Sequence, residues 1–344
     1  MLVEVRRGGR VESRHRGCVV AVDAGGRQVF AAGRVSESIY PRSSLKFFQA
    51  IPLIAGGGAD RFNLSQSEIA LACASHSAEA FHLRTVTRWL QRLGLSADDL
   101  ECGADPPLSE RAARDLIQAG EPPTRAHHNC SGKHAGMLTV ARHIGADDSG
   151  AATRGYSDYH HPCQRAWMQA LSEWLDTDVF SLPWERDGCG LPALCMPLDQ
   201  LARAFARCAD AGRLAATLTP ASALGAALAR ILKAVRAEPQ MLAGTGRCCT
   251  DVIRATAGRV LIKAGAEGVC GGVIPGLGLG FALKIDDGAG RARDVAVGAL
   301  LHKLGALDAS SESQLEAHFR PKVVNSQGRV TGEIAPAQWF AEGA

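Results

Sequence analysis

The sequence predicts an α+β fold, in which both ends of the chain build one antiparallel sheet and a mostly helical region is inserted between them. Alternating apolar residues, typical of strands, occur within about residues 1–40 and return within about 259–304. Apolar residues at helical spacing dominate about 41–258. Because no linker or internal repeat interrupts the 344 residues, we expect a single domain over 1–344.

The strands are placed by their residue types and by the turns between them. The run 17–23 is rich in β-branched residues, the glycines of 24–27 supply a turn, and 28–35 returns as a second strand. Three further strands with the same alternation are expected at 259–263, 268–273 and 278–285.

Helices are expected wherever apolar residues recur every three or four positions. The predicted helices cover 43–55, 67–75, 80–93, 109–119, 133–143, 162–175, 198–211, 221–237 and about 293–304. The stretch 181–197 and the tail after Ser310 have no clear pattern.

Composition excludes several classes of protein. A formal net charge of +3, with 5% aromatic residues and no dense basic run, argues against nucleic acid as a partner. No apolar stretch is long and uncharged enough to span a membrane, and residues 1–7 lack the apolar core of a signal peptide. The eleven cysteines include no Cys-x-x-Cys pair, which argues against a disulfide scaffold. We therefore expect a cytoplasmic protein.

Lysine is scarce, since the chain has seven lysines and thirty-one arginines. Arginine stays protonated in proteins, whereas a desolvated lysine can lose its proton and act as a base or a ligand. Three of the seven lie in short polar segments, namely Lys46, Lys133 and Lys263. Codon bias with ordinary surface lysines is the alternative explanation.

The first of these segments is Ser43-x-x-Lys46, which follows Pro41. Positions three apart share a helix face, so the lysine amine can reach the serine hydroxyl and take its proton. A proline before the helix places Ser43 in the first turn, whose free N–H groups favour an oxyanion. The pattern is weak by itself, because a helix cap followed by a solvated lysine looks the same.

Two more segments complete a series. Ser75-His76-Ser77 ends an apolar run and either faces a cavity or simply stops a helix, and Lys263 precedes a small residue and a glycine after a strand. Ser-x-x-Lys, Ser-x-Ser and Lys-x-Gly in this order resemble the motifs of penicillin-recognising serine hydrolases. The chain departs from them at Ser77, where asparagine is usual, and at Ala264, where threonine or serine is usual.

The fourth segment runs from His127 to His134 and includes Cys130; a second polar turn containing Cys189 follows some fifty-five residues later. Three interpretations stay open for this pair of segments. Cys130, Cys189, His128 and His134 have the donor atoms of a zinc site. Cys130 can instead be a nucleophile with a histidine as its base. The third is a glycine-containing turn that enters a helix and carries an incidental thiol.

Together the segments 38–46, 74–77, 128–134, 187–190 and 263–268 resemble the Rhizobium-type L-asparaginases, also called the asparaginase II family. The match extends to 243–247 and 284–288, so the resemblance covers nearly the whole chain. It implies a fold like that of serine β-lactamases and penicillin-binding proteins. It also implies homodimers and the hydrolysis of L-asparagine to L-aspartate and ammonia.

The resemblance further implies roles for nine residues. Two Ser–Lys pairs would carry the chemistry, a zinc ion would be held nearby, and two residues would lie close to the substrate. The pairs are Ser43 with Lys46 and Ser75 with Lys263, the zinc ligands are Cys130, Lys133 and Cys189, and the substrate contacts are Arg42 and Asp187. A lysine ligand must be neutral, which explains why residue 133 is not arginine.

Two other functional classes are compatible with the same motifs. One is a Ser–Lys esterase or β-lactam-recognising enzyme, against which the absent export signal and Ala264 count. The other is a non-catalytic zinc-binding protein that reuses the scaffold. The resemblance favours an asparagine amidohydrolase over both.

Overall fold

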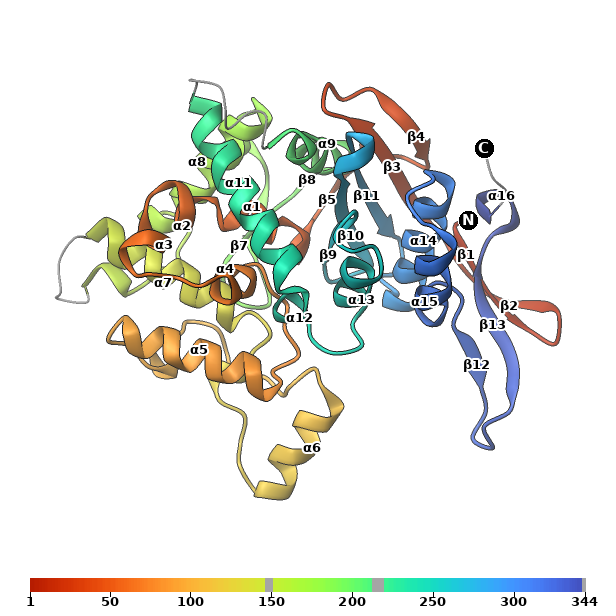
Figure 1. Ribbon diagram of the computed structural model, residues 1–344, viewed down its shortest axis with the longest axis horizontal. Coiled ribbons are helices and arrows are strands. Elements are labelled where there is room, and N and C mark those ends of the chain that lie inside the picture. The colour runs from red at the N-terminus through yellow and green to blue at the C-terminus, as the bar shows by residue number, and fades with distance from the viewer. Residues whose placement is uncertain (146–150, 212–219, 342–344) are drawn as a thin grey trace. The chain divides into compact units, whose positions relative to one another are not determined.

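The computed structural model describes residues 1–145, 151–211 and 220–341 (Figure 1). The chain divides into two compact units. The first unit comprises Met1–Ser44, Cys195–Asp210 and Asp251–Ala344, and the second comprises Leu45–Leu194 and Ala211–Thr250. Both ends of the chain therefore build the first unit, whereas most of the inserted helical region forms the second. The single domain expected over 1–344 stays a prediction.

The main sheet of the first unit has five antiparallel strands in the order β4-β3-β11-β10-β9. Their bounds are β3 Gly17–Asp23, β4 Gln28–Ala32, β9 Leu261–Ala264, β10 Val269–Ile274 and β11 Leu279–Ile285. At its centre β3 pairs with β11, so strands from opposite ends of the chain are hydrogen-bonded to each other. This confirms the predicted antiparallel sheet built from both ends.

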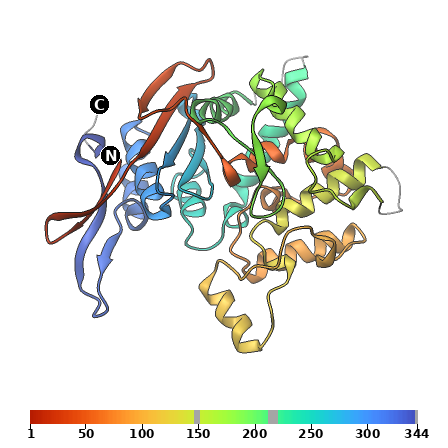
Figure 2. The same cartoon turned by 180° about the vertical axis from the view of Figure 1, so that it is seen from behind.

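A second sheet takes up the remaining N-terminal strands, which differs from the prediction of one sheet (Figure 2). It has the order β12-β13-β1-β2, with β1 Val3–Arg7, β2 Arg10–His15, β12 Lys322–Val324 and β13 Val330–Pro336. The tail after Ser310 supplies half of its strands. β13 runs from the exposed Val330 to the buried Pro336 without alternation, so its sequence gives too weak a signal to assign a strand.

Helices lie on both sides of the five-stranded sheet (Figure 1). The helices and short elements of this unit are α9 Leu198–Ala209, α14 Gly290–Lys303, α15 Ala309–Phe319, α16 Gln338–Ala341, the 3-10 turn η6 Pro275–Leu277 and the two-stranded pair β5 Ser38–Ile39 with β8 Met196–Pro197. α9 contacts β3, β10 and β11, and α14 contacts β10 and β11. The approach of α9 is close because β11 has a glycine, Gly280, beneath it.

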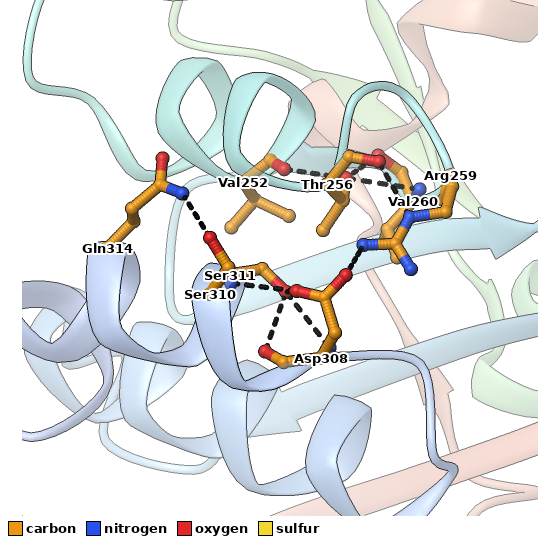
Figure 3. A network of polar contacts seen from close by, with 8 residues as sticks. All are labelled: Val252, Thr256, Arg259, Val260, Asp308, Ser310, Ser311 and Gln314. Carbon is orange, nitrogen blue, oxygen red and sulfur yellow. Dashed lines mark hydrogen bonds and ion pairs between the residues drawn. The ribbon is translucent and has the colours of Figure 1, made fainter.

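A polar network fixes the turn that leads into β9 (Figure 3). Asp308 caps α15 by accepting from the Ser311 N–H at 2.9 Å, and it also accepts from the guanidinium of Arg259. The Thr256 hydroxyl donates to the Val252 carbonyl at 2.7 Å, which closes the preceding helix α13 (Cys248–Ala255). The start of α15 and the start of β9 are thus held together, and β9 carries Lys263.

The second unit is mostly helical. Its elements are α1 Lys46–Gln49, α2 Ile51–Ala55, α3 Gly58–Arg61, α4 Gln66–Ala72, α5 Ala80–Arg92, η2 Ala97–Asp99, α6 Glu110–Ala119, η3 Arg125–His127, α7 Ser131–Gly145, η4 Ala151–Thr153, α8 Pro162–Leu175, η5 Val179–Ser181, β6 Trp184–Arg186, β7 Pro192–Leu194, α11 Pro220–Ala237 and α12 Pro239–Leu242. Helix α7 lies in the middle and packs on α2, α3, α4, α5 and α8. Its side chains are buried from Ser131 to Ala141, which explains why it carries small and apolar residues on every face.

The helix predicted at 43–55 is broken, which corrects the expectation for Ser43. A 3-10 turn, η1 (Arg42–Leu45), is followed by α1 and then by α2, whose Pro52 has no N–H to continue a helix from α1. Ser43 therefore does not occupy the first turn of an α-helix. The Ser44 N–H donates to the Pro41 carbonyl at 3.1 Å, so it is not free to hold an oxyanion.

Among the helices of the described ranges, none combines the length and the apolar character needed to cross a bilayer.

Two stacked histidines are buried in the second unit. Their ring centroids lie 5.0 Å apart, and His76 and His82 are both fully buried. Nδ1 of His82 accepts from the Glu79 N–H at 3.2 Å, and Nε2 lies 3.0 Å from the Gln240 carbonyl, to which a neutral ring with its proton on Nε2 donates. Burial lowers the pKa of His82 to about 4 and holds the pKa of His76 well below its usual range.

We predict that Gly280→Ala destabilises the first unit by about 3 kcal/mol. An added methyl group at Gly280 would lie 2.0 Å from the Ala206 nitrogen and 2.4 Å from the Ala202 carbonyl oxygen, so α9 would have to move off the sheet. Urea unfolding measures the change. Gly290→Ala is the matched control, because nothing lies within 4 Å of its added methyl group; equal stability of both variants would contradict the close packing of α9 on β11.

We also predict that the protein loses stability as the pH falls from about 6.5 towards 4. Both histidines have lowered pKa values in the folded state, so below pH 6.5 the unfolded chain binds protons that the native state does not bind. Each such histidine lowers the free energy of unfolding by about 1.4 kcal/mol per pH unit across that window.

Denaturant unfolding at several pH values measures this loss. His82→Gln, which keeps a donor for the Gln240 carbonyl, should flatten the pH dependence. His160→Gln changes an exposed ring and should leave it unchanged. An unaltered slope in the His82 variant would contradict the assignment.

Candidate active site

The three lysines singled out in the sequence are the buried ones. Lys46, Lys133 and Lys263 have exposed fractions of 0%, 3% and 1%. The other four lysines are exposed or half-buried; they are Lys233, Lys284, Lys303 and Lys322. The interpretation of Lys46 as a solvated lysine behind a helix cap is therefore wrong.

Lys46 joins three segments of the second unit. Its Nζ lies 2.5 Å from the Ala74 carbonyl oxygen, 2.9 Å from Ser75 Oγ and 3.1 Å from Cys130 Sγ. An ammonium group has three N–H donors, so these three acceptors satisfy it fully. The lysine of the first motif is thus in direct contact with the serine of the second and with a cysteine of the fourth.

The segment that follows α4 holds Ser75 in an irregular, well-anchored conformation. The Ser75 N–H donates to the Leu242 carbonyl at 3.0 Å, and the His76 N–H donates to the Asn129 carbonyl at 3.0 Å. Ala78 has a φ of 57°, a left-handed conformation that costs a non-glycine residue on the order of 1 kcal/mol. Strain of this kind tends to occur at functional sites.

Ser43, Arg42 and Lys263 belong to the first unit. Ser43 and Arg42 are half-buried in η1, and Arg42 has a left-handed φ of 54°. Lys263 donates to the Ala264 carbonyl at 2.7 Å on the edge strand β9. A Cβ at Gly265 would lie 2.6 Å from the Pro41 carbonyl oxygen, so the glycine lets the end of β9 approach the turn that carries Ser43.

Within each unit the structure brings some of the nine predicted residues together. The first unit holds Ser43 near the end of the Lys263 strand, and the second holds Lys46 against Ser75. The pairings of Ser43 with Lys46 and of Ser75 with Lys263 stay predictions. Nothing in the local sequence signalled the contact between Lys46 and Cys130, because it joins residues 84 positions apart.

The last group is a buried cluster of cysteine and lysine. β6 and β7 form a hairpin whose turn is closed by hydrogen bonds between Asp187 and both Gly190 and Leu191, and Cys189 lies within it. Lys133 Nζ donates to Cys189 Sγ at 3.0 Å, and Cys130 lies within hydrogen-bonding reach of Cys189. The hairpin, which no sequence pattern predicted, thus brings Cys189 to the start of α7.

The cysteine sulfurs and the Lys133 amine of this cluster shift each other's pKa values. The hydrogen bond from Cys130 outweighs burial and, with the Lys133 ammonium, lowers the pKa of Cys189 well below its usual range. Burial alone would lower the pKa of Lys133, but the sulfurs of Cys189 and Cys130 and the Asp187 carboxylate together raise it. Cys102, a buried thiol nearby, has its pKa raised to about 12, chiefly by burial. Both shifts favour a thiolate on Cys189 beside an ammonium on Lys133.

The two histidines considered as alternative ligands have other partners. His134 Nδ1 lies 2.6 Å from the Tyr156 hydroxyl. His128 Nδ1 accepts from the Cys130 N–H at 2.9 Å, and its Nε2 lies 3.3 Å from the Asp105 carboxylate. His128 accordingly shapes the backbone that presents the Cys130 thiol.

The donor set of the cluster fits a zinc ion. Zinc bonds of about 2.3 Å to sulfur and about 2.0 Å to nitrogen place neighbouring ligand atoms of a tetrahedron about 3.5 Å apart. The Lys133 amine and the Cys189 sulfur are close to that separation, and the three side chains are at least 96% buried. Binding would require Lys133 to lose its proton, as every amine ligand must.

Comparison with known proteins supports an enzymatic assignment. No curated protein is matched by the chain. A family model described as L-asparaginase II matches residues 3–336, nearly the whole length. The chain therefore belongs to the L-asparaginase II family and is an L-asparaginase.

Proposed function

We propose that the enzyme hydrolyses L-asparagine through a serine ester, in the manner of the Rhizobium-type enzymes that its motifs resemble. The observation that carries this proposal is the buried 2.9 Å hydrogen bond between Lys46 Nζ and Ser75 Oγ, because it joins the lysine of one motif to the serine of another. A serine β-lactamase-like fold is part of the proposal. The five-stranded antiparallel sheet covered by helices and the separate helical unit support it.

In the first half of the proposed reaction, Ser43 Oγ attacks the side-chain amide carbon of asparagine and Lys46, in its neutral form, takes the hydroxyl proton. The C–N bond then breaks, and ammonia leaves with a proton delivered by Ser75 and Lys263. The product is an aspartyl ester on Ser43. In the second half, the same pair takes a proton from water, the hydroxide attacks the ester, and Ser43 regains its proton as aspartate departs.

The contacts of Lys46 suit this cycle. Three acceptors surround Nζ, which matches the ammonium that exists once the proton of Ser43 has been taken. Because one of these acceptors is the Ser75 hydroxyl, the proton has a direct route to the second serine. This contact supports a shared proton between the two pairs.

Substrate binding is assigned to two residues. Arg42 would hold the α-carboxylate of asparagine through a bidentate pair, since its guanidinium matches a carboxylate in geometry. Asp187 would contact the α-amino group. The left-handed backbone at Arg42 supports a functional role, because such strain persists only where the surroundings impose it.

Zinc would be held by Cys130, Lys133 and Cys189. When bound, the ion would supply a Lewis acid or a fixed point for the substrate. The protein would contribute burial and the fixed hairpin that presents Cys189. Homodimers and a cytoplasmic location complete the proposal.

The direct test is a coupled ammonia assay with asparagine and glutamine side by side, with and without chelator. Release of ammonia from asparagine supports the proposal. Hydrolysis of a chromogenic β-lactam or a short-chain ester in its place would favour the other Ser–Lys hydrolases. Zinc binding without ammonia release would favour a non-catalytic zinc-binding protein.

We predict that Ser43→Ala abolishes turnover and leaves the fold intact, because the ester cannot form. A loss of at least about a thousandfold in kcat is expected. Ser310→Ala, which changes an exposed hydroxyl of the first unit, is the control. Activity of the Ser43 variant within about tenfold of the parent would sink the assignment.

Rapid quenching followed by mass spectrometry identifies the nucleophile independently. An aspartyl ester on the peptide that contains Ser43 is the expected result. An ester on Ser75 would reverse the roles of the two serines and leave Lys46 as the base of Ser75.

We predict that purified protein holds about one zinc ion per chain and that Cys189→Ala lowers this content severalfold, because a thiolate ligand is lost. Elemental analysis after dialysis measures it. Cys208→Ala removes another buried thiol, one in α9 of the first unit, and serves as the matched control. Unchanged content in the Cys189 variant would remove Cys189 from the ligand set.

A further inference from the structure

Glu79 lies four residues after Ser75 and holds together two parts of the second unit. Its Oε1 accepts from the Ser77 hydroxyl at 2.7 Å and from the Thr245 N–H at 2.8 Å. Its Oε2 accepts from the Thr245 hydroxyl at 2.8 Å. Both oxygens of the carboxylate are thus used to join the segment after Ser75 to the turn around Thr245.

The turn around Thr245 is also the one that anchors Ser75. The Leu242 carbonyl accepts from the Ser75 N–H at 3.0 Å. Gly244, with a φ of 119°, lets the backbone lie directly on Ser77, since a Cβ there would be 1.9 Å from Ser77 Oγ. The turn therefore touches the Ser75 segment at two places, and Glu79 holds the second.

Ala78, which lies between Ser77 and Glu79, has a strained backbone conformation. Ala78 keeps a φ of 57° although nothing in an alanine side chain favours it. The bridge from Glu79 back to Ser77 spans Ala78, and His76 Nδ1 accepts from the Ala78 N–H at 3.1 Å, so the carboxylate and the imidazole together hold this conformation. Burial would raise the pKa of Glu79, but the hydrogen bonds from Ser77 and Thr245 outweigh it and lower that pKa. The carboxylate is charged at neutral pH.

We propose that Glu79 is a positioning residue whose carboxylate locks the Ser75 segment onto the turn 242–245 and thereby fixes Ser75 Oγ at Lys46 Nζ. The inference rests on the proposed function, in that Ser75 takes part in asparagine hydrolysis. Glu79 itself acts through Ser77 and Thr245 and needs no contact with the substrate.

The test compares kcat and KM for asparagine in Glu79→Ala and Glu79→Gln. Loss of the bridge should lower kcat by about a hundredfold, as a displacement near 1 Å does, with KM within about threefold of the parent. Glutamine should keep kcat within about fivefold, because its amide oxygen can accept from Ser77 and the Thr245 N–H while its NH2 donates to the Thr245 hydroxyl.

Glu68→Ala is the matched control. The Glu68 carboxylate also closes a helix cap, with Ser65, and pairs with Arg92, so its loss should lower Tm. Its hydrogen-bond partners in the described part of the chain, Ser65 and Arg92, lie outside the Ser75 segment, so kcat should stay within about twofold of the parent. A drop in kcat equal to that of Glu79→Ala would show that lost stability alone explains the effect and would overturn the inference.

Hydrogen exchange of the peptide containing residues 74–79 provides a readout without turnover. Exchange there should be faster in Glu79→Ala and unchanged in Glu79→Gln and Glu68→Ala. Unchanged exchange in Glu79→Ala overturns the inference. A parent enzyme that does not hydrolyse asparagine contradicts the proposed function instead. The two failures are therefore separate.

Two other outcomes are decisive. If Glu79→Gln falls as low as Glu79→Ala, the negative charge and not the geometry is required, and the inference is overturned. If Glu79→Ala does not fold, Glu79→Asp replaces it, because a side chain about 1.5 Å shorter cannot hold both partners. A loss of about tenfold in kcat supports the inference, and a kcat within about threefold of the parent overturns it.

Discussion

The buried amine of Lys46 is the interaction on which the second unit's functional groups depend. A buried polar group is costly unless it is hydrogen-bonded, and Lys46 has a carbonyl, a hydroxyl and a thiol around its nitrogen. Each of these acceptors comes from a different part of the chain than α1. The requirement to satisfy one amine therefore fixes the end of α4, the residue before α7 and the start of α1 relative to one another.

This constraint links two groups of residues that are separate in sequence. Cys130 accepts from Lys46 and lies within hydrogen-bonding reach of Cys189, which in turn accepts from Lys133. A continuous chain of contacts thus runs from Ser75 to Lys133. An ion bound by Cys130 and Cys189 would share Cys130 with Lys46, the proposed proton carrier. A change in the charge of the ion site would therefore alter the hydrogen bonding of Lys46, and the reverse.

The sequence predicts where long, regular helices and strands lie better than it predicts where a helix is broken or which strands share a sheet. Strand 17–23 and helix 162–175 have the predicted bounds because their periodicity is long and regular. The helix expected at 43–55 is broken, since Pro52 overrides a pattern that is helical in every other respect. The second sheet escaped prediction because its central pairing, of β1 with β13, joins residues more than 300 positions apart.

The site was predictable in its residue types and not in its contacts. Lysine scarcity identified the three buried lysines, because arginine cannot supply a neutral amine and therefore cannot replace lysine where one is needed. Which serine each lysine meets depends on tertiary packing, and the contact of Lys46 with Ser75 has no local signal. Glu79 is a similar case, since its partner Thr245 is 166 positions away.

A residue such as Glu79 carries no motif of its own, yet it decides how firmly the motif residue is held. Ser75 Oγ contacts Lys46 Nζ and the Ser75 N–H is anchored on the Leu242 carbonyl, but neither contact sets the conformation of Ser77 and Ala78. The left-handed Ala78 shows that those residues do not adopt their preferred conformation. A side chain with two polar atoms at its end is well suited to impose it, because it can reach Ser77 and Thr245 at the same time. Precision at Ser75 thus depends on a carboxylate outside the Ser–Lys motifs.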